Sequence, residues 1–310
     1  MGRACLAPPH VLAQTRRRRY SRLRRAMTRC EVTVLYEGRS EVGAPPAAVW
    51  PVLLDVNQLA ALLPGITVEV LPEIDSTNTE LMRRARAGDI RTCLLLADQQ
   101  TAGRGRLGRQ WHSQAGDALT FSLGLMLAPH NWSGLSLAVG CSLAQALDPG
   151  RDKGLGLKWP NDLMLAPWDS PRKLGGILIE TMLRQGDAAL QRFVVIGIGL
   201  NLAAPPAAEY RTPPAGWRQV MGPQTSAAEV LQMLLPELVA GLTRFCAQGF
   251  AAFVDEFARR DVLSGQALVL SNGLQGLADG ADREGVLWLN TPGGRVAVSS
   301  DEVSVRRREA

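Results

Sequence analysis

The stretch of sequence that decides the fold runs from residue 118 to residue 147 and reads ALTFSLGLMLAPHNWSGLSLAVGCSLAQAL. Its first ten residues, 118–127, are apolar enough for a buried strand, and residues 135–147 predict a core helix. Outward from this stretch, the pattern predicts strands at 66–70, 92–97, 155–159, 175–182 and 193–202, and a helical region at 225–260. Because strands and helices intermix without regular βαβ alternation, we expect an α/β (α+β) fold, a mixed sheet flanked by helices.

The helix starts carry local signals. Thr77 with Glu80, and Ser226 with Glu229, fit capping boxes, in which a hydroxyl and a carboxylate satisfy free backbone N–H groups. A further short helix is predicted over residues 47–63, interrupted by Pro51 and ended at residues 64–65.

The C-terminal part has a different sequence pattern. Beyond Asp261, short β-runs broken by glycine predict strands at 267–270, 285–289, 295–298 and 303–306, as in a small β-barrel or sandwich. We therefore expect four segments: a basic, disordered tail at 1–30, an N-terminal extension with one short helix at 31–65, a main domain at 66–261 and a small β domain at 262–310.

Composition excludes several classes of protein. A chain of 310 residues that is 46% hydrophobic has the length for about two packed domains. No uninterrupted apolar stretch reaches the ~18 residues of a membrane span. The five scattered cysteines form no CxxC pair and suit a reducing compartment, and three histidines effectively exclude a His/Cys metal cage.

The basic charge belongs to the tail. Residues 1–30 hold nine arginines and no acidic residue, so of the net charge of +5 the other 280 residues carry −4. A run such as Arg16–Arg19 can contact nucleic acid or an anionic membrane. We favour a disordered extension, or a true start at Met27. A secretory signal is excluded because no apolar segment follows the arginines.

The first chemical motif is GRGRLG at residues 103–108. It matches the GxGxxG pattern, but the following residues predict no helix, which argues against a dinucleotide-binding turn. Glycines allow a backbone to approach a ligand closely, and Arg104, Arg106 and Arg109 offer forked donors for phosphate or carboxylate oxygens. The alternative is a solvated basic turn, which gives no reason for this alternation beside Trp111.

The second motif is KWPND at residues 158–162, followed by Lys173. Pro160 holds Trp159 extended, and Asn161-Asp162 predict a hairpin turn whose return strand starts at Lys173. A lysine at a strand start is placed for a phosphate or carboxylate. A third motif, GIGLNL at 197–202, ends in an amide that either reads an adenine edge or caps the strand. Each motif alone also fits a purely structural role.

Together these segments resemble the biotin protein ligases (biotin–[acetyl-CoA-carboxylase] ligases). The resemblance covers about residues 66–306 and rests on the stretches 76–78, 100–111, 158–162, 173–177 and 197–201. Gly175 stands where alanine is frequent in the family. The resemblance implies a class II aminoacyl-tRNA synthetase-like catalytic domain that binds biotin and ATP, at 66–261, and an SH3-like C-terminal domain at 262–310.

The resemblance also implies the reaction: biotin and ATP form biotinyl-5′-AMP, and biotin passes to a lysine of a biotin carboxyl carrier protein. It implies Lys173 and Arg106 as catalytic residues. It assigns biotin binding to Ser76, Thr77, Asn78, Gln100, Gly103, Arg104, Gly105, Arg106 and Lys173. It assigns ATP or adenylate binding to Arg104, Arg109, Trp111, Asn161, Asp162 and Asn201.

Mg²⁺ is expected to come with ATP, and no metal site made of protein ligands alone is expected. We expect a cytoplasmic enzyme, with a homodimer as one option for its assembly and with neither specific DNA binding nor membrane binding. The hydroxyls and amides of 76–78 and Gln100 suit the ureido ring of biotin, since a buried polar group left unpaired costs about 1–3 kcal/mol.

Three alternatives stay open. A lipoate or octanoate ligase or transferase shares the fold, but a linear acyl chain gives no reason for the ureido partners. A nicotinamide oxidoreductase needs the Rossmann context that is missing here. A repressor–ligase needs an N-terminal winged helix, and a recognition unit of that kind has three helices, whereas residues 31–65 predict about one. We therefore expect the form that lacks the DNA-binding domain.

Overall fold

A mixed eight-stranded sheet forms the centre of the computed structural model, which describes residues 33–36, 61–183, 191–206, 210, 212–298 and 305–307. Strands β1 to β3 run parallel, and every other neighbouring pair is antiparallel, so the expected mixed sheet is confirmed. Across the sheet the strands are β1 (Thr33–Tyr36), β2 (Thr67–Ile74), β3 (Cys93–Gln100), β6 (Ala118–Leu127), β10 (Arg192–Asn201), β9 (Arg172–Met182), β8 (Asp162–Leu165) and β7 (Leu155–Lys158).

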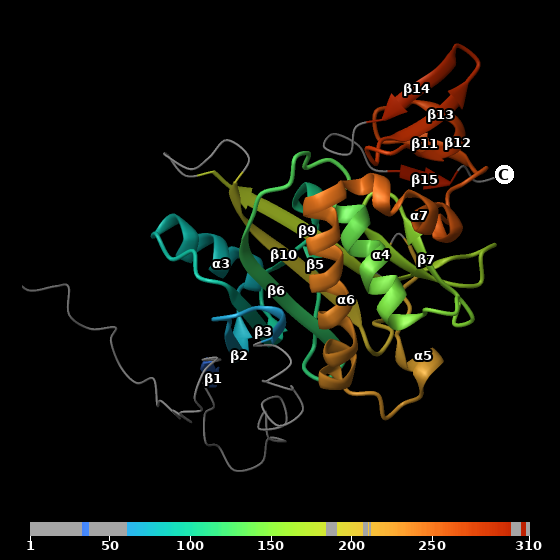
Figure 1. Ribbon diagram of the computed structural model, residues 1–310. Coiled ribbons are helices and arrows are strands. Elements are labelled where there is room, and N and C mark those ends of the chain that lie inside the picture. The colour runs from blue at the N-terminus through green and yellow to red at the C-terminus, as the bar shows by residue number, and fades with distance from the viewer. Residues whose placement is uncertain are drawn as a thin grey trace, which may run out of the picture.

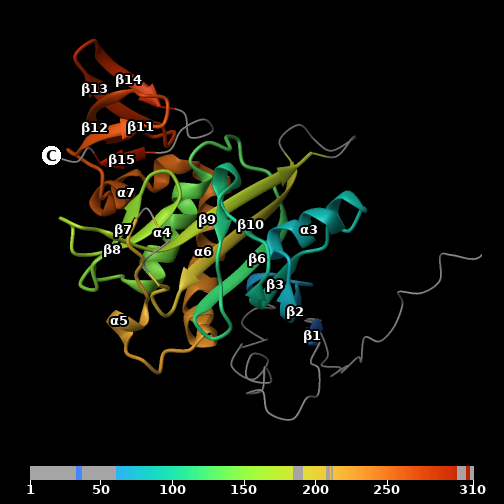
Figure 2. The ribbon, with the colours of Figure 1, turned by 180° about the vertical axis from the view of Figure 1, so that it is seen from behind.

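Helices cover both faces of this sheet. Successive side chains of a strand point to opposite faces. In β6, Phe121 and Leu123 point into the large core under α4 (Leu135–Leu147) and α6 (Ala227–Gln248), whereas Gly124 faces Leu81 of α3 (Thr77–Arg86). Figures 1 and 2, seen from opposite sides, show α4 and α6 together on one side of β9 and β10.

The longest helix, α6, is a core helix in this fold. It begins at the capping box of Ser226 and Glu229, as the sequence predicts, and runs through Pro236. By length and composition alone it could cross a membrane, with a mean hydropathy of 1.3. Here its apolar side chains, among them Leu234 and Leu238, are buried in the same cluster as those of α4.

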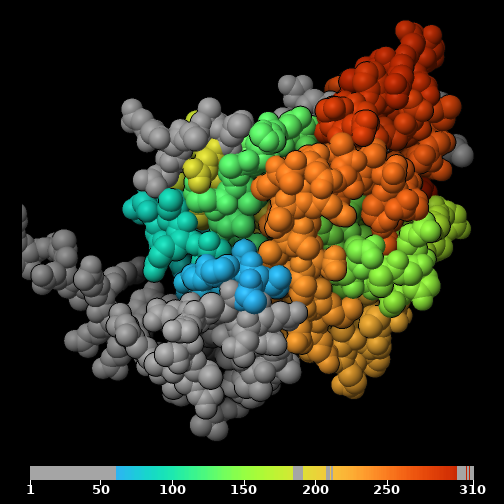
Figure 3. Space-filling model, in the orientation of Figure 1, coloured from blue at the N-terminus to red at the C-terminus, as the bar shows by residue number. Residues whose placement is uncertain are grey.

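A second, five-stranded antiparallel sheet forms the C-terminal part, at one corner of the molecule (Figure 3). Its order is β14 (Gly294–Val298), β13 (Leu287–Thr291), β12 (Gln275–Ala281), β11 (Ala267–Leu270) and β15 (Val305–Arg307). The small β domain expected from the sequence is thus present, although β12 was not predicted. The short helix α5 (Arg218–Met221) precedes α6, and two further short segments, η4 (Phe250–Ala252) and α7 (Val254–Arg260), lead from α6 to the second sheet.

The two sheets share one continuous apolar cluster. The indole of Trp159 donates a hydrogen bond to the carbonyl of Gly285 at 3.0 Å, and the hydroxyl of Ser133 donates to the carbonyl of Glu284 at 2.6 Å. The loop between β12 and β13 is therefore fastened to the main domain.

The N-terminal expectations are tested only in part. The predicted extension at 31–65 contains a strand that was not predicted, β1, which pairs with β2 of the main sheet. The predicted tail and most of the helix at 47–63 lie outside the described residues, although Ala61 and Leu62 are helical.

Two local predictions placed the start of an element at the wrong residue. Helix α3 is capped by Ser76, whose hydroxyl accepts from the N–H of Thr79, and Glu80 instead pairs with two arginines of the same helix. The turn after KWPND returns at once, because Asp162 pairs with Lys158 and opens β8. The return strand of that hairpin thus starts at Asp162, and Lys173 belongs to the next strand, β9.

Arg260 fastens α7 to the main domain. Its side chain is 1% exposed. Its guanidinium donates to the carbonyl of Asp148 at 2.6 Å, to that of Leu155 at 3.3 Å and to the carboxylate of Glu256 at 2.5 Å. The carboxylate of Asp148, fully buried, lies 3.8 Å away. Removing the arginine would leave that carboxylate without its counter-ion.

We predict that Arg260→Ala lowers the free energy of unfolding by about 3–5 kcal/mol, the cost of leaving a buried charge unpaired. Arg259→Ala is the matched control: it removes a 2.7 Å bond to the same Glu256 from a half-exposed side chain, and should cost below about 1 kcal/mol. Urea denaturation of both variants measures the difference, and equal small losses would contradict this role for Arg260.

Candidate active site

The register of the sheet builds a smooth floor on the face that carries α3. Residues that are paired across neighbouring strands form one row that crosses six strands. The row consists of Ala97, Thr120, Gly199, Gly176, Asp162 and Lys158. Two adjacent glycines lie at its centre, so the middle of the row contributes no side chains of its own, and charged groups stand at one end. We call this row the glycine floor.

Two side chains lie directly on β10. A Cβ on Gly199 would meet the Trp111 ring at 2.5 Å, and a Cβ on Gly197 would collide with the Asn78 side chain. Trp111 comes from β5 (Gln110–Trp111), and Asn78 from the first turn of α3. Glycine is therefore required at both positions for these two side chains to reach the sheet.

A buried hydrogen-bonded cluster borders the glycine floor where α3 begins. The backbone N–H of Thr77 donates to the Gln100 side-chain oxygen at 2.7 Å, and the Thr77 hydroxyl lies 3.1 Å from that oxygen. The hydroxyls of Thr77 and Ser122 are 2.7 Å apart, and Ser122 donates to Asn78 Oδ1 at 2.6 Å. The fold thus brings together three of the four predicted ureido partners.

Ser76, the fourth, serves the helix. Its hydroxyl accepts the N-cap hydrogen bond of α3, 3.4 Å from the N–H of Thr79. Sequence reasoning also missed two residues. Ser122 is the only strongly polar side chain within 121–127 of an apolar strand, and Glu180 stands in the apolar stretch of β9. A polar residue in a buried strand is the signal that could have found them.

The motif at 103–108 forms a loop over this cluster. Its ends pair as β4 (Gly103–Arg104) with β5, and a single turn, η2 (Arg106–Gly108), lies between. No α-helix follows, which confirms that this is not a Rossmann turn. A Cβ on Gly103 would collide with the carbonyl of Trp111.

The arginines of this loop differ in placement. The Arg104 side chain, half exposed, reaches α3 and β9, where it lies 3.3 Å from the Glu180 carboxylate and 3.4 Å from the hydroxyl of Thr79. Arg109 is exposed, and its carbonyl accepts from the N–H of Gly105 at 2.7 Å. Arg106 is half-buried at the start of η2.

Lys173 lies beside the charged end of the glycine floor. Its ammonium group donates to the Asp162 carboxylate at 2.6 Å, and both side chains are partly exposed. Asn161 donates to the carbonyl of Ile177 at 2.9 Å, and buried Asn201 lies 3.5 Å from the carbonyl of Lys173. The two amides thus hold the backbone around this lysine.

Two buried polar atoms flank Gly199 without a protein partner. They are the indole Nε1 of Trp111 and the hydroxyl of Thr120. A buried polar group left unpaired costs about 1–3 kcal/mol, so such atoms are expected where a ligand supplies the partner. A polar ligand lying along the glycine floor would supply a partner to both atoms.

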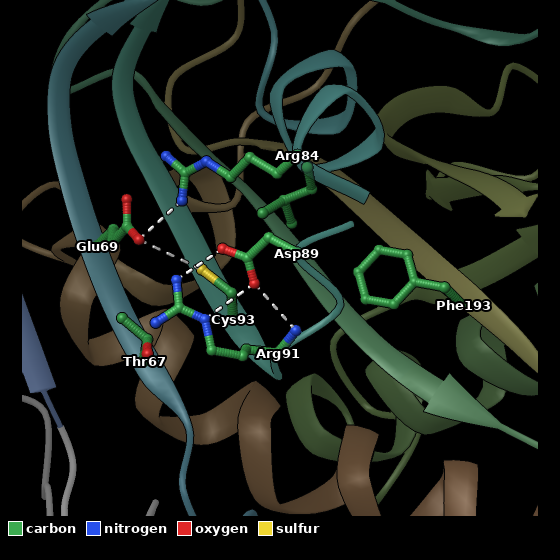
Figure 4. A pocket seen from close by; sticks show the side chains of 8 residues that line it. Thr67, Glu69, Arg84, Asp89, Arg91, Cys93 and Phe193 are labelled. Carbon is green, nitrogen blue, oxygen red and sulfur yellow. Dashed lines mark hydrogen bonds and ion pairs between the residues drawn. The ribbon is translucent and has the colours of Figure 1, made fainter. Parts of the chain in front are cut away.

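A separate hollow lies under the last turn of α3 (Figure 4). Its charges pair with one another: Arg84 with Glu69 at 2.7 Å, and Arg91 with Asp89 at 2.6 Å. Burial, and then the nearby Glu69 carboxylate, raise the pKa of the Cys93 thiol to about 12, so the thiol stays protonated and unreactive. This hollow carries no chemistry of its own.

Comparison with known proteins identifies the family. Residues 70–201 match the model of the biotin/lipoate A/B protein ligase family. The chain is 36% identical over 268 residues to the bifunctional ligase/repressor BirA of Escherichia coli, covering 83% of this chain and 79% of that protein. The chain belongs to the biotin protein ligase family. It is also 32% identical to the biotin–[acetyl-CoA-carboxylase] ligase of Paracoccus denitrificans, covering 76% of this chain and 98% of that one.

Solved structures agree with this assignment. The biotin protein ligase from Aquifex aeolicus in complex with biotin and ATP superposes with a TM-score of 0.64 at 28% identity. The match covers 78% of this chain and 99% of that one. The fold expected from the resemblance, a mixed sheet with helices and a small C-terminal β domain, is therefore confirmed as the biotin protein ligase fold.

We predict that Gly199→Ala destabilises the ligase by about 1–3 kcal/mol, the usual cost of overpacking, because the new methyl group displaces the Trp111 ring. Gly293→Ala is the control, since its nearest atom would be 3.8 Å away, and it should change stability by less than about 0.5 kcal/mol. Thermal or urea unfolding measures both. Equal stability of the two variants would mean that Trp111 does not depend on the bare backbone.

Proposed function

We propose that the glycine floor and the cluster at the start of α3 hold biotin and ATP, and that the enzyme joins them into biotinyl-5′-AMP. The chain is an ATP-dependent biotin–protein ligase, and its substrate class follows from its family. The observation that carries the placement is the buried Thr77, Gln100 and Ser122 cluster beside a floor whose charged end lies next to Lys173. The ureido ring would lie at the cluster and the carboxylate toward Lys173.

In the first step a carboxylate oxygen of biotin attacks the α-phosphorus of ATP, a new P–O bond forms, and pyrophosphate leaves. Carboxylate and phosphates are all anionic, so their approach needs cations held in place. Lys173 would supply a point charge beside the reacting atoms, and Arg104, Arg106 and Arg109 would offset the remaining charge. No protein nucleophile is needed, because positioning and charge stabilisation carry the step.

In the second step the amine of the carrier lysine attacks the acyl carbon of the mixed anhydride. A C–N amide bond forms, AMP leaves with the electron pair of the broken C–O bond, and the amine loses a proton. Arg106 on the loop would hold the adenylate until the carrier arrives. The proposed adenylate contacts also include Trp111, Asn161, Asp162 and Asn201, as expected from the sequence.

Mg²⁺ fits this site as a companion of ATP. Within the described ranges no group of three His, Cys, Asp or Glu side chains could hold a metal ion. Mg²⁺ is usually held by phosphate oxygens, waters and one or two carboxylates, and Asp162 is the acidic residue of the glycine floor. The ion would lower the negative charge of the phosphates.

The alternative, a lipoate or octanoate ligase, is not favoured. A linear acyl chain brings no partner for the Thr77, Gln100 and Ser122 cluster, whereas a ureido ring brings two N–H donors and one carbonyl acceptor. The Paracoccus denitrificans relative is likewise named a biotin–[acetyl-CoA-carboxylase] ligase.

The partner implied by the activity is a biotin carboxyl carrier protein or domain. We propose a soluble, cytoplasmic enzyme without specific DNA or membrane binding, in which a homodimer is a possible assembly. The proposal on DNA rests on sequence, since residues 1–32 and 37–60 lie outside the described part of the chain.

We predict biotin-dependent exchange of radiolabelled pyrophosphate into ATP, and a gain of one biotinyl group on a biotin carboxyl carrier domain by mass spectrometry. A carrier whose acceptor lysine is replaced by arginine is the control and should gain nothing. Exchange that responds to lipoate or octanoate, with no response to biotin, would move the enzyme to the other branch of the family.

We predict that Lys173→Ala slows adenylation by a factor of roughly 10² or more, the scale for one preorganised charge partner. Lys173 also neutralises Asp162, so Lys173→Ala leaves the Asp162 carboxylate unpaired. The double variant Lys173→Ala/Asp162→Asn removes that carboxylate as well, and it therefore separates the effect of losing the ammonium group from the effect of the unpaired carboxylate. Recovery of the rate in the double variant would overturn the direct role. Lys153→Ala is the control. It removes an ammonium group that pairs with the exposed Asp152 at 3.5 Å, and it should leave the single-turnover rate unchanged.

A further inference from the structure

Glu180 has two hydrogen-bonding neighbours at the edge of the cluster. Its side chain projects from β9, 21% exposed. One carboxylate oxygen accepts from the Asn78 side-chain nitrogen at 3.0 Å, and the other lies 3.3 Å from the Arg104 guanidinium. The Asn78 contact is the stronger constraint, since Asn78 is 3% exposed whereas the Arg104 side chain is half exposed.

A carboxylate only accepts hydrogen bonds. Asn78 must therefore turn its NH₂ group toward Glu180, and the same nitrogen also donates to the carbonyl of Leu178 at 3.2 Å. Two acceptors fix the amide, and its oxygen then points away from them, toward Ser122. Gly197 supplies the space, because a Cβ there would collide with this amide.

The orientation of Asn78 determines the next two bonds. Ser122 has one hydroxyl proton, which it donates to Asn78 Oδ1 at 2.6 Å. The oxygen of Ser122 must then accept from Thr77 across their 2.7 Å contact. The other neighbour of the Thr77 hydroxyl, the Gln100 side-chain oxygen at 3.1 Å, is also an acceptor. The single proton of Thr77 is thus directed into the protein.

We propose that Glu180 is a positioning residue that fixes this direction and so keeps the Thr77 oxygen an acceptor for a ureido N–H of biotin. The proposal rests on the proposed function. It makes Glu180 a determinant of specificity for acids that carry an N–H donor, although Glu180 itself does not touch the ligand. Without the carboxylate, Asn78 can flip and the chain of bonds can reverse. The Thr77 proton is then held only by the longer contact to the Gln100 side-chain oxygen, at 3.1 Å, from which it can turn to the ligand.

The first test is Glu180→Gln, which keeps the shape and removes the obligate acceptor. We expect the dissociation constant for biotin to rise about tenfold, the equivalent of one net hydrogen bond, while the KM for ATP stays within about twofold. Glu73→Gln, on the exposed part of β2, is the control and should change neither. A biotin methylated on a ureido nitrogen should bind wild type and Glu180→Gln alike.

A double-mutant cycle separates this role from general support of the fold. Thr77→Val removes the acceptor, so adding Glu180→Gln to it should weaken biotin binding no further. Ser122→Ala interrupts the same chain one bond closer to Thr77 and must reproduce the tenfold loss, which gives a second measurement if Glu180→Gln folds poorly.

Full additivity of Glu180→Gln and Thr77→Val, or unchanged biotin binding in both Glu180→Gln and Ser122→Ala, would overturn the proposal while wild-type activity stands. A wild-type enzyme without biotin-dependent exchange would overturn the proposed function and this inference with it.

Discussion

The bare backbone of β10 at Gly197 and Gly199 is the constraint on which the site depends. β10 pairs along ten residues with β6 and along eight with β9, so its position is fixed by hydrogen bonds on both sides. Because the two glycines carry no side chain, Trp111 and Asn78 can lie directly on the sheet. The active site therefore depends on the lack of side chains at these two glycines as well as on the side chains that surround them. The strand that carries both glycines, β10, lies at the centre of the molecule.

Much of the fold could be predicted because burial leaves a strong sequence pattern. Residues 118–127 and 135–147 form β6 and α4 with the predicted bounds, since both are almost continuously apolar. Strand β12 escaped prediction because its sequence, QGLADGA, has few apolar residues. The hairpin after KWPND was misplaced because Asn161-Asp162 marks a turn but not where the pairing resumes. Asp162 itself is the first paired residue.

The site could be predicted only through its motifs. Thr77, Asn78 and Gln100 stand in recognisable segments, and the fold brings them within hydrogen-bonding distance of one another or of Ser122. Ser122 and Glu180 belong to strands that the sequence marks simply as buried. Their contacts with Asn78 arise from the register between β6, β10 and β9, which no local pattern encodes. Conversely, Asn161 and Asn201 stand out in the sequence, yet their side chains bond to nearby backbone.

Trp159 connects the KWPND segment to the C-terminal sheet. Its neighbours Lys158 and Asp162 belong to the glycine floor, whereas its own ring is buried in the shared core and bonded to the β12–β13 loop. A ligand that binds the floor only in the folded state stabilises that state by its free energy of binding. Every element that unfolds together with the floor shares this stabilisation. Occupancy of the active site then also stabilises the contact between the C-terminal sheet and the main domain, through the Trp159 indole together with the Ser133 hydrogen bond and the shared apolar cluster.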